Sequence, residues 1–257
     1  MKRTATIGFD RRVQREWLDA IASKRAAGAT VPELRKFGHK LLRSECPADE
    51  ARGKTLTVLF HLWVDVPANG VDLRDGAGKL LADLDSTHRI ALHWGLGLAT
   101  YPFFRDTADG TGRLLALQDS VSLAQIQRRL AERWGQRSTT QRAAQRIVRS
   151  WIDWGVLRES KQRGTYLARK PIELAGPLAS WMVEAILVGT DAESRAVAEV
   201  RKAPQLFPFD LKVSAHDLRR APRIAVHRQG VDEDVVMLRP SVRRAAPPGK
   251  RGQLRLL

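Results

Sequence analysis

The chain has 257 residues, of which 43% are hydrophobic, with a single cysteine and a formal net charge of +16. This hydrophobic content excludes a wholly disordered chain, the lone Cys46 excludes an internal disulfide, and no apolar run approaches the roughly 20 residues that a membrane span needs. The first residues are charged where a signal peptide would need an apolar block, so we expect no signal peptide in them. We therefore expect a soluble, cytoplasmic protein without membrane association, and its positive charge indicates an acidic partner such as nucleic acid.

The first hundred residues are predicted to be all-helical. Apolar side chains recur at helical spacing, Gly28 and Pro102 mark helix ends, and Thr30 and Ser86 are suitable N-cap residues. The predicted helices cover residues 10–27, 30–42, 48–64, 73–84 and 86–101. Residues 1–101 are therefore expected to form a helical N-terminal domain.

The next segment, residues 102–172, shows a helix-turn-helix pattern. A helix is predicted over residues 103–117. Ser122 then caps a second helix, Gly135 ends it, and Ser138 supplies the N-cap of a third. Two helices joined by such a tight turn are typical of a helix-turn-helix.

The helix that follows this turn, from Thr139 to Asp153, has two faces of different chemistry. Its apolar side chains recur at helical spacing and are Ala143, Ala144, Ile147, Val148, Trp151 and Ile152. The polar side chains assigned to the other side are Thr139, Thr140, Gln141, Arg142, Gln145, Arg146 and Arg149. Arg and Gln carry the forked donors that match guanine and adenine edges in a major groove, so this face predicts contact with DNA.

A short basic β-hairpin is predicted after this helix. Gly155 ends the helix, a strand begins at Val156, and the chain returns as a second strand over residues 165–167. The turn between the strands carries Lys161 and Arg163. Helix, turn, helix and basic hairpin together form the layout of a winged helix-turn-helix.

Positive charge is concentrated in this region. Residues 122–170 contain twelve Lys and Arg against three acids, so a balance of +9, more than half of the net charge, lies in one short segment. A surface of this kind favours binding of nucleic acid. The same pattern also fits an amphipathic helix and hairpin whose basic side is merely solvated.

Residues 173–238 are expected to form a small α/β region. Its predicted elements are helices over 177–188 and 191–202 and the strands of a hairpin over 223–228 and 234–238. From Arg239 onward six basic residues occur without an acid, among several Pro and Gly. Residues 239–257 are therefore predicted to be a disordered basic tail that adds non-specific phosphate contacts.

The sequence contains no motif for catalysis, a metal or a cofactor. The six histidines are scattered, and His88 and His93 are five residues apart, which puts them on different faces of a helix. The one catalytic alternative is a metal-dependent nuclease that uses side chains near the C-terminal hairpin, namely His216, Asp217, Asp232, Glu233 and Asp234. Consecutive acids in a turn are usually just solvated, so we expect a protein that is not an enzyme.

The order of these signals resembles a known family. The resemblance rests on the helical start, an apolar helix before Phe103, then Trp134, an Arg-rich helix and the end of that helix at Gly155. Over roughly Trp17 to Leu157 this layout resembles the small DNA-binding component of bacteriophage-exclusion (BREX) defence systems. The resemblance implies a helical fold with winged-helix-like parts, DNA binding, and a non-enzymatic role beside other proteins of a phage-defence complex. A winged-helix transcription regulator would show the same residues.

We therefore predict a mainly α protein, with a helical N-terminal part, a winged helix-turn-helix and a small α/β C-terminal region, that binds double-stranded DNA. We expect four side chains to approach base edges, with Thr139 next to them at the start of the helix. These four are Thr140, Gln141, Arg142 and Gln145. Those expected at phosphates or in an adjacent groove are Arg146, Arg149, Lys161 and Arg163. The alternative is a helical scaffold that binds an acidic protein, and burial of the basic face beneath the C-terminal region would favour it.

Overall fold

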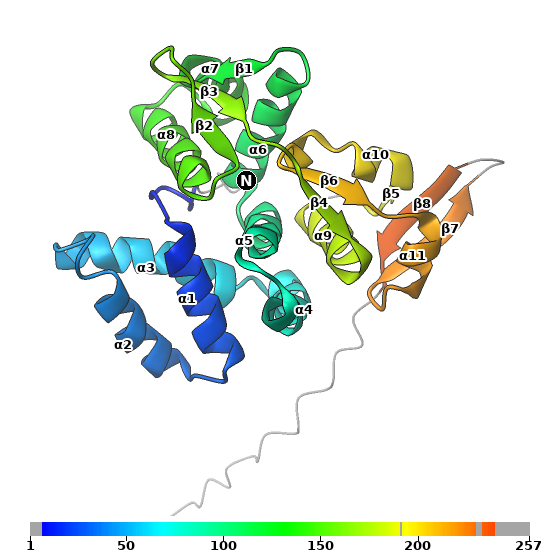
Figure 1. The fold of residues 1–257 in the computed structure, drawn as a ribbon, viewed down its shortest axis with the longest axis horizontal. Helices are drawn as coiled ribbons and strands as arrows, with labels where there is room; N and C mark the ends of the chain where they lie inside the picture. Colours follow the sequence, from blue (N-terminus) through cyan, green and yellow to red (C-terminus); the bar gives the residue numbers. More distant parts are fainter. Residues whose placement is uncertain (1–6, 191, 230–232, 240–257) are drawn as a thin grey trace, which may run out of the picture.

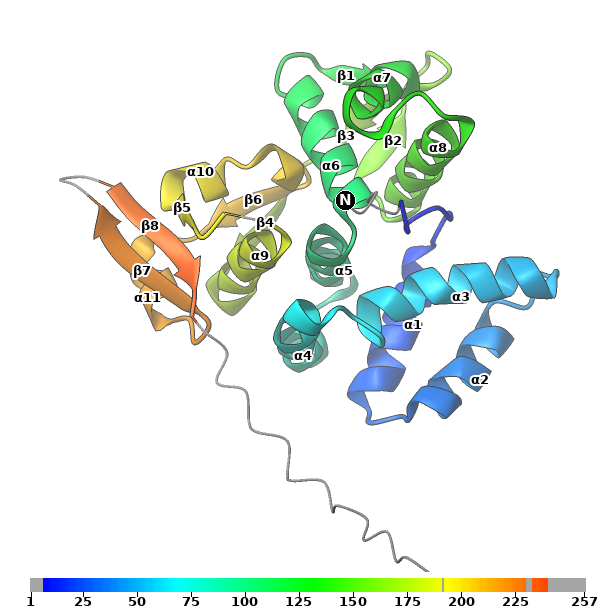
Figure 2. The same cartoon turned by 180° about the vertical axis from the view of Figure 1, so that it is seen from behind.

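A computed structural model describes residues 7–190, 192–229 and 233–239, and these parts of the chain are mainly helical, with small sheets toward the C-terminus (Figure 1). The predicted mainly α class is therefore confirmed. Helix α5 (Ser86–Thr100) lies at the centre of the molecule in two opposite views (Figures 1 and 2). Within the described ranges, no helix combines the length and the apolar character needed to cross a membrane.

The N-terminal part is helical, as predicted. Its elements are α1 (Arg15–Ala26), α2 (Val31–Leu41), α3 (Asp49–Trp63), the 3-10 turn η1 (Ala68–Gly70), α4 (Val71–Leu80) and the 3-10 turn η2 (Leu81–Asp83). Thr30 precedes α2 as expected, and its backbone N–H donates to the Glu33 carboxylate at 2.8 Å. Helix α5 is capped by Asp85 and not by Ser86, because Asp85 Oδ1 accepts the backbone N–H of Thr87 at 2.8 Å.

The segment before α1 is not helical, so the prediction of a helix from residue 10 is wrong over its first turn. Phe9 and Val13 are fully buried in this segment. The backbone N–H of Val13 donates to Ser150 Oγ at 2.8 Å, and Trp154 Nε1 donates to the Val13 carbonyl at 2.8 Å. In a helix that began at residue 10 the Val13 carbonyl would accept the backbone N–H of Trp17, but here it accepts from the Trp154 indole.

The middle of the chain contains three helices and a three-stranded antiparallel sheet. The elements are α6 (Pro102–Leu115), β1 (Ser120–Ser122), α7 (Leu123–Trp134), α8 (Ser138–Asp153), β2 (Leu157–Glu159) and β3 (Thr165–Ala168). The sheet order is β1-β3-β2, with Val121 opposite Tyr166 in the first pair. Ser122 caps α7 as predicted, whereas α8 begins at Ser138 itself, with Arg137 in the N-cap position.

The C-terminal region mixes short strands and helices. Its elements are β4 (Ile172–Ala175), α9 (Gly176–Gly189), β5 (Ser194–Ala196), α10 (Val197–Arg201), the 3-10 turn η3 (Pro204–Leu206), β6 (Phe209–Lys212), α11 (Ala215–Arg220), β7 (Ile224–Gln229) and β8 (Glu233–Leu238). The predicted hairpin β7-β8 is present. The predicted helix over 191–202 is confirmed only as the short helix α10, because strand β5 precedes it and pairs with β8. Strands β4 and β6 form a separate parallel pair. Of the predicted tail, all but Arg239 lies outside the described residues.

One hydrophobic core joins these three parts, and Trp94 of α5 lies in its middle with no exposed surface. Its ring lies 5.0 Å from that of Trp151 on α8, 5.2 Å from that of Phe104 on α6, and 5.4 Å from that of Phe207 beside η3. Aromatic pairs at these centroid separations pack favourably. The buried face of helix α8 therefore packs against residues that are far apart in the sequence.

Candidate nucleic-acid interface

Helix α8 is fixed in the structure by its buried face and by the N-terminal segment. Besides the bonds that Ser150 and Trp154 form with Val13, Arg12 Nε donates to Asp153 Oδ2 at 2.6 Å. These contacts span the whole last turn of the helix. The opposite side of α8 is left facing outward on a rigid support, as a binding surface requires.

Most of the side chains predicted to contact DNA are accessible. Thr139, Gln141, Arg142 and Arg149 are exposed, and Gln145 is half-buried. Thr140 is the exception on this helix, because its side chain is buried and the residue is only 3% exposed. Thr140 lies four residues before Ala144 and so belongs to the apolar stripe, which corrects its assignment to the polar face.

Two of the predicted arginines on α8 bond to the chain itself. Arg146 Nη1 donates to the carbonyl of Asp10 at 2.5 Å and is half-buried, so Arg146 holds the N-terminal segment in place. This bond competes with the phosphate contact predicted for it. Arg142 bends back toward Ser138, at 3.3 Å from the carbonyl and 3.4 Å from Oγ. These two long bonds on an exposed side chain are weak, so Arg142 remains free to extend.

The hairpin carries its cations at its tip. Lys161 and Arg163 are exposed in the turn between β2 and β3, where Gly164 has a φ of +75° that suits glycine. Exposed Arg158 on β2 adds a charge that the sequence-based site did not include. The prediction of a short hairpin with a charged turn is confirmed, since Arg158 pairs with Leu167 across the strands.

The cations of residues 122–170 are largely uncompensated. Of the twelve, only Arg129 and Arg133 form an ion pair with a carboxylate among the described residues, at 3.9 Å to Glu132 and 2.9 Å to Asp106. The carboxylate of Asp153 is paired with Arg12 instead. The positive potential of this surface is therefore not cancelled by local acids.

A second basic surface on α2 was missed in the sequence. Exposed Lys36, Lys40 and Arg43 line a shallow groove of about 580 Å³ together with Lys24 of α1 and the ring of Phe37. None of these four cations has an ion pair within the described part of the chain. The spacing of four and three residues was a signal that could have revealed this face.

Two of the acidic side chains considered for a nuclease have structural roles. Asp217 Oδ2 accepts the backbone N–H of Ser214 at 2.9 Å at the start of α11, and Asp234 Oδ1 accepts from Arg219 at 2.9 Å. Asp232 lies outside the described residues. The described ranges contain no cluster of three or more His, Cys, Asp or Glu suited to a metal ion.

Buried His93 also has a structural place. His93 Nδ1 accepts from Trp63 Nε1 at 3.0 Å, so its other nitrogen carries the proton toward Asp19 Oδ1 at 2.9 Å. Burial lowers the pKa of His93 and favours its neutral form.

Comparisons with protein-family models, curated proteins and solved structures found no match. The exposed cations of α8 and the hairpin are therefore the basis for a functional assignment.

Proposed function

We propose that this protein binds double-stranded DNA without catalysing a reaction, through a winged helix-turn-helix formed by residues 102–172. The element order α6, β1, α7, α8, β2, β3 supports this proposal, because it is the order of that motif. Further support comes from the amide of Gln127, which donates to the Gln141 carbonyl at 3.0 Å and fixes α7 against α8.

In this proposal α8 enters the major groove. Gln141, Arg142 and Gln145 approach base edges, with Thr139 at the helix start. Arg149 and the hairpin cations Lys161 and Arg163 contact phosphates on either side. Thr140 and Arg146 take no part, because the first is buried and the second is bonded to Asp10.

The observation that carries the proposal is the uncompensated charge on an open surface. The described C-terminal elements pack on α4, α5 and α6, and none of the residues in the described ranges covers the outer side of α8. Burial of this face beneath the C-terminal region would have favoured a helical scaffold that binds an acidic protein, and within the described ranges the face is exposed. The resemblance to the BREX component would place DNA binding in phage defence, and a transcription regulator would use the same face.

The test is fluorescence anisotropy with an unspecific DNA duplex across a salt series. The site variant combines Arg149→Ala, Lys161→Ala and Arg163→Ala. The charge-matched control combines Lys36→Ala and Lys40→Ala on α2 with Arg43→Ala just after it. Each lost phosphate contact reduces the slope of log affinity against log salt by about 0.9, so the site variant should lose about 2.7 and the control nothing.

Either of two results overturns the proposal. Absence of binding by the wild type at low salt removes DNA as the ligand, and an acidic protein partner is then sought. A loss of slope in the α2 control, with the site variant unchanged, moves the DNA surface from α8 to α2.

A further inference from the structure

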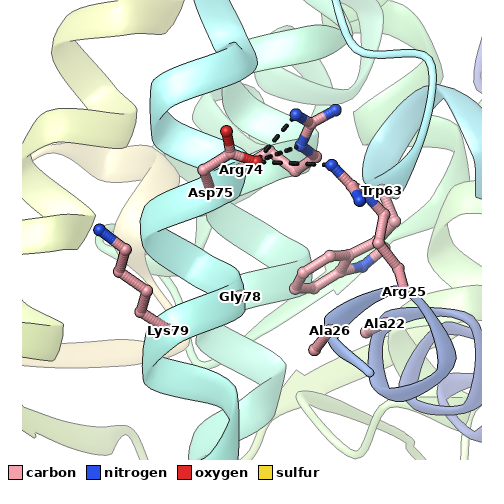
Figure 3. A pocket seen from close by; sticks show the side chains of 8 residues that line it. All are labelled: Ala22, Arg25, Ala26, Trp63, Arg74, Asp75, Gly78 and Lys79. Carbon is pink, nitrogen blue, oxygen red and sulfur yellow. Dashed lines mark hydrogen bonds and ion pairs between the residues drawn. The ribbon is translucent and has the colours of Figure 1, made fainter. Parts of the chain in front are cut away.

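A separate cavity of about 260 Å³ lies between α1 and α4, beside the end of α3. Figure 3 shows the guanidinium groups of Arg25 and Arg74 side by side at this cavity, near the ring of Trp63, with Asp75 beside them. Lys79 lies at the rim. This cavity is at the opposite end of α1 from the residues that bond to α8 (Figures 1 and 2).

The carboxylate of Asp75 accepts hydrogen bonds from both guanidinium groups. Arg74 is held firmly, because its Nε donates to Asp75 Oδ1 at 2.9 Å and its Nη1 to the Val64 carbonyl at 2.9 Å. Arg25 Nη2 reaches the same Asp75 oxygen only at 3.5 Å. Figure 3 shows the Lys79 side chain pointing away from the two arginines, so two guanidinium groups face one acid and one positive charge remains uncompensated at the cavity.

Arg25 is also incompletely hydrogen-bonded. Its Nε is buried and has no hydrogen-bond partner among the described residues. Burial lowers the pKa of Arg25, and repulsion by Arg74 lowers it further. A buried donor without a partner costs free energy, so Arg25 is held less firmly than Arg74 and its guanidinium group can turn toward an anion in the cavity.

We propose that this cavity binds a small phosphate group through the guanidinium group of Arg25, with Arg74 as the neighbouring charge. The fork of donors in arginine matches phosphate oxygens in pairs. A phosphate monoester carries nearly two negative charges at neutral pH and is therefore attracted by the two guanidinium groups more strongly than a carboxylate, which carries one. Trp63 is only 1% exposed, so the site offers no open aromatic face for a stacked base.

The cavity exists because its wall is lined by small residues. A Cβ atom added to Gly78 would meet no heavy atom within 4 Å, so a larger side chain fits there and fills the cavity. Gly53 on α3 has equally open surroundings and lies outside the cavity, so it provides a matched control.

The test is a titration of the intact protein with inorganic phosphate at constant ionic strength, balanced with sodium chloride. The readout is the NMR signal of the Trp63 indole N–H, assigned with Trp63→Phe. The four variants are Arg25→Gln, Asp75→Asn, Gly78→Leu and Gly53→Leu. We expect a saturable shift in the wild type and in Gly53→Leu, and its loss in Arg25→Gln and Gly78→Leu.

The change in phosphate affinity caused by Asp75→Asn is the decisive result, because its direction is predicted. This substitution removes the carboxylate that competes with phosphate for both guanidinium groups, so binding should become about fivefold tighter. An absent or non-saturable shift in the wild type overturns the proposal, and so does weaker binding by Asp75→Asn or an unchanged response in Arg25→Gln. At a phosphate concentration ten times Kd, the folded-to-unfolded ratio should rise about elevenfold, which thermal unfolding measures independently.

The source of the phosphate is distinguished by a second arm. If a DNA duplex shifts the Trp63 signal and displaces inorganic phosphate, the group belongs to a nucleic acid backbone. If only free phosphate shifts it, the ligand is a small molecule. Neither outcome depends on whether α8 binds DNA.

Discussion

Arg146 and Arg149 lie three residues apart on α8, and the structure predicts opposite effects for their replacement. Arg146 Nη1 donates to the Asp10 carbonyl at 2.5 Å and is half-buried. A hydrogen bond to a charged group contributes about 1.5–3 kcal/mol, and partial exposure places this bond at the lower end. Arg146→Ala should therefore destabilise the fold by about 1.5 kcal/mol, which lowers Tm by about 3–6 °C in a chain of this size.

Arg149 is exposed and has no ion pair among the described residues. Arg149→Ala should therefore change the free energy of unfolding by less than about 0.5 kcal/mol. If Arg149 contacts a phosphate, its loss reduces the slope of log affinity against log salt by about 0.9. Between roughly 50 and 200 mM salt this amounts to about a 3.5-fold smaller loss of affinity.

The two variants are compared by thermal unfolding followed by circular dichroism and by DNA anisotropy across that salt range. The two arginines together test whether α8 is divided into an anchoring edge and a binding face. The division is refuted if Arg149→Ala unfolds as early as Arg146→Ala. It is also refuted if Arg146→Ala keeps the wild-type Tm and loses the salt slope.

Three further predictions follow from single positions. Arg142→Ala should cost about 1–3 kcal/mol on a preferred DNA site selected from random duplexes, and an equal loss on all sequences would identify a phosphate contact. Gly112→Ala should lower the free energy of unfolding, measured in urea, by about 1–3 kcal/mol, because the added Cβ would lie 1.8 Å from the Pro204 carbonyl oxygen. Gly53→Ala has open space around it and should raise the free energy of unfolding by about 1 kcal/mol. Because the pKa of His93 is lowered by burial, the wild type should lose stability as pH falls below about 6.5, and His93→Gln should lack this component in unfolding curves taken at several pH values.

The helices were predictable because an amphipathic period is local information. Ser122 and Gly135 mark the ends of α7 in the sequence, and both roles hold in the structure. The errors occur where a tertiary contact overrides the local pattern. Residues 10–13 carry a helix-compatible sequence, but the peptide groups of Val13 bond to α8, which lies more than a hundred residues away.

Short strands were the second source of error. Strands β1, β4, β5 and β6 contain three or four residues each, too few for an alternating pattern to be visible. Their pairing partners are also distant in sequence, as with Ile172 of β4 and Phe209 of β6. The hairpin β7-β8 was predictable because its two strands are longer and adjacent in the chain.

Within the candidate interface, the sequence separates the faces of α8 but not the functions of its cations. Thr140 could have been placed correctly, because its spacing to Ala144 and Ile147 continues the buried stripe by one turn. Arg146 could not, because only the fold brings the Asp10 carbonyl beside it. An arginine on the edge between a buried and an open face can bond inward or outward, and the N-terminal segment decides this at Arg146. Arg149 has no such segment beside it among the described residues, so its charge stays available to a ligand, and this difference supports our proposal that the outer face of α8 binds DNA.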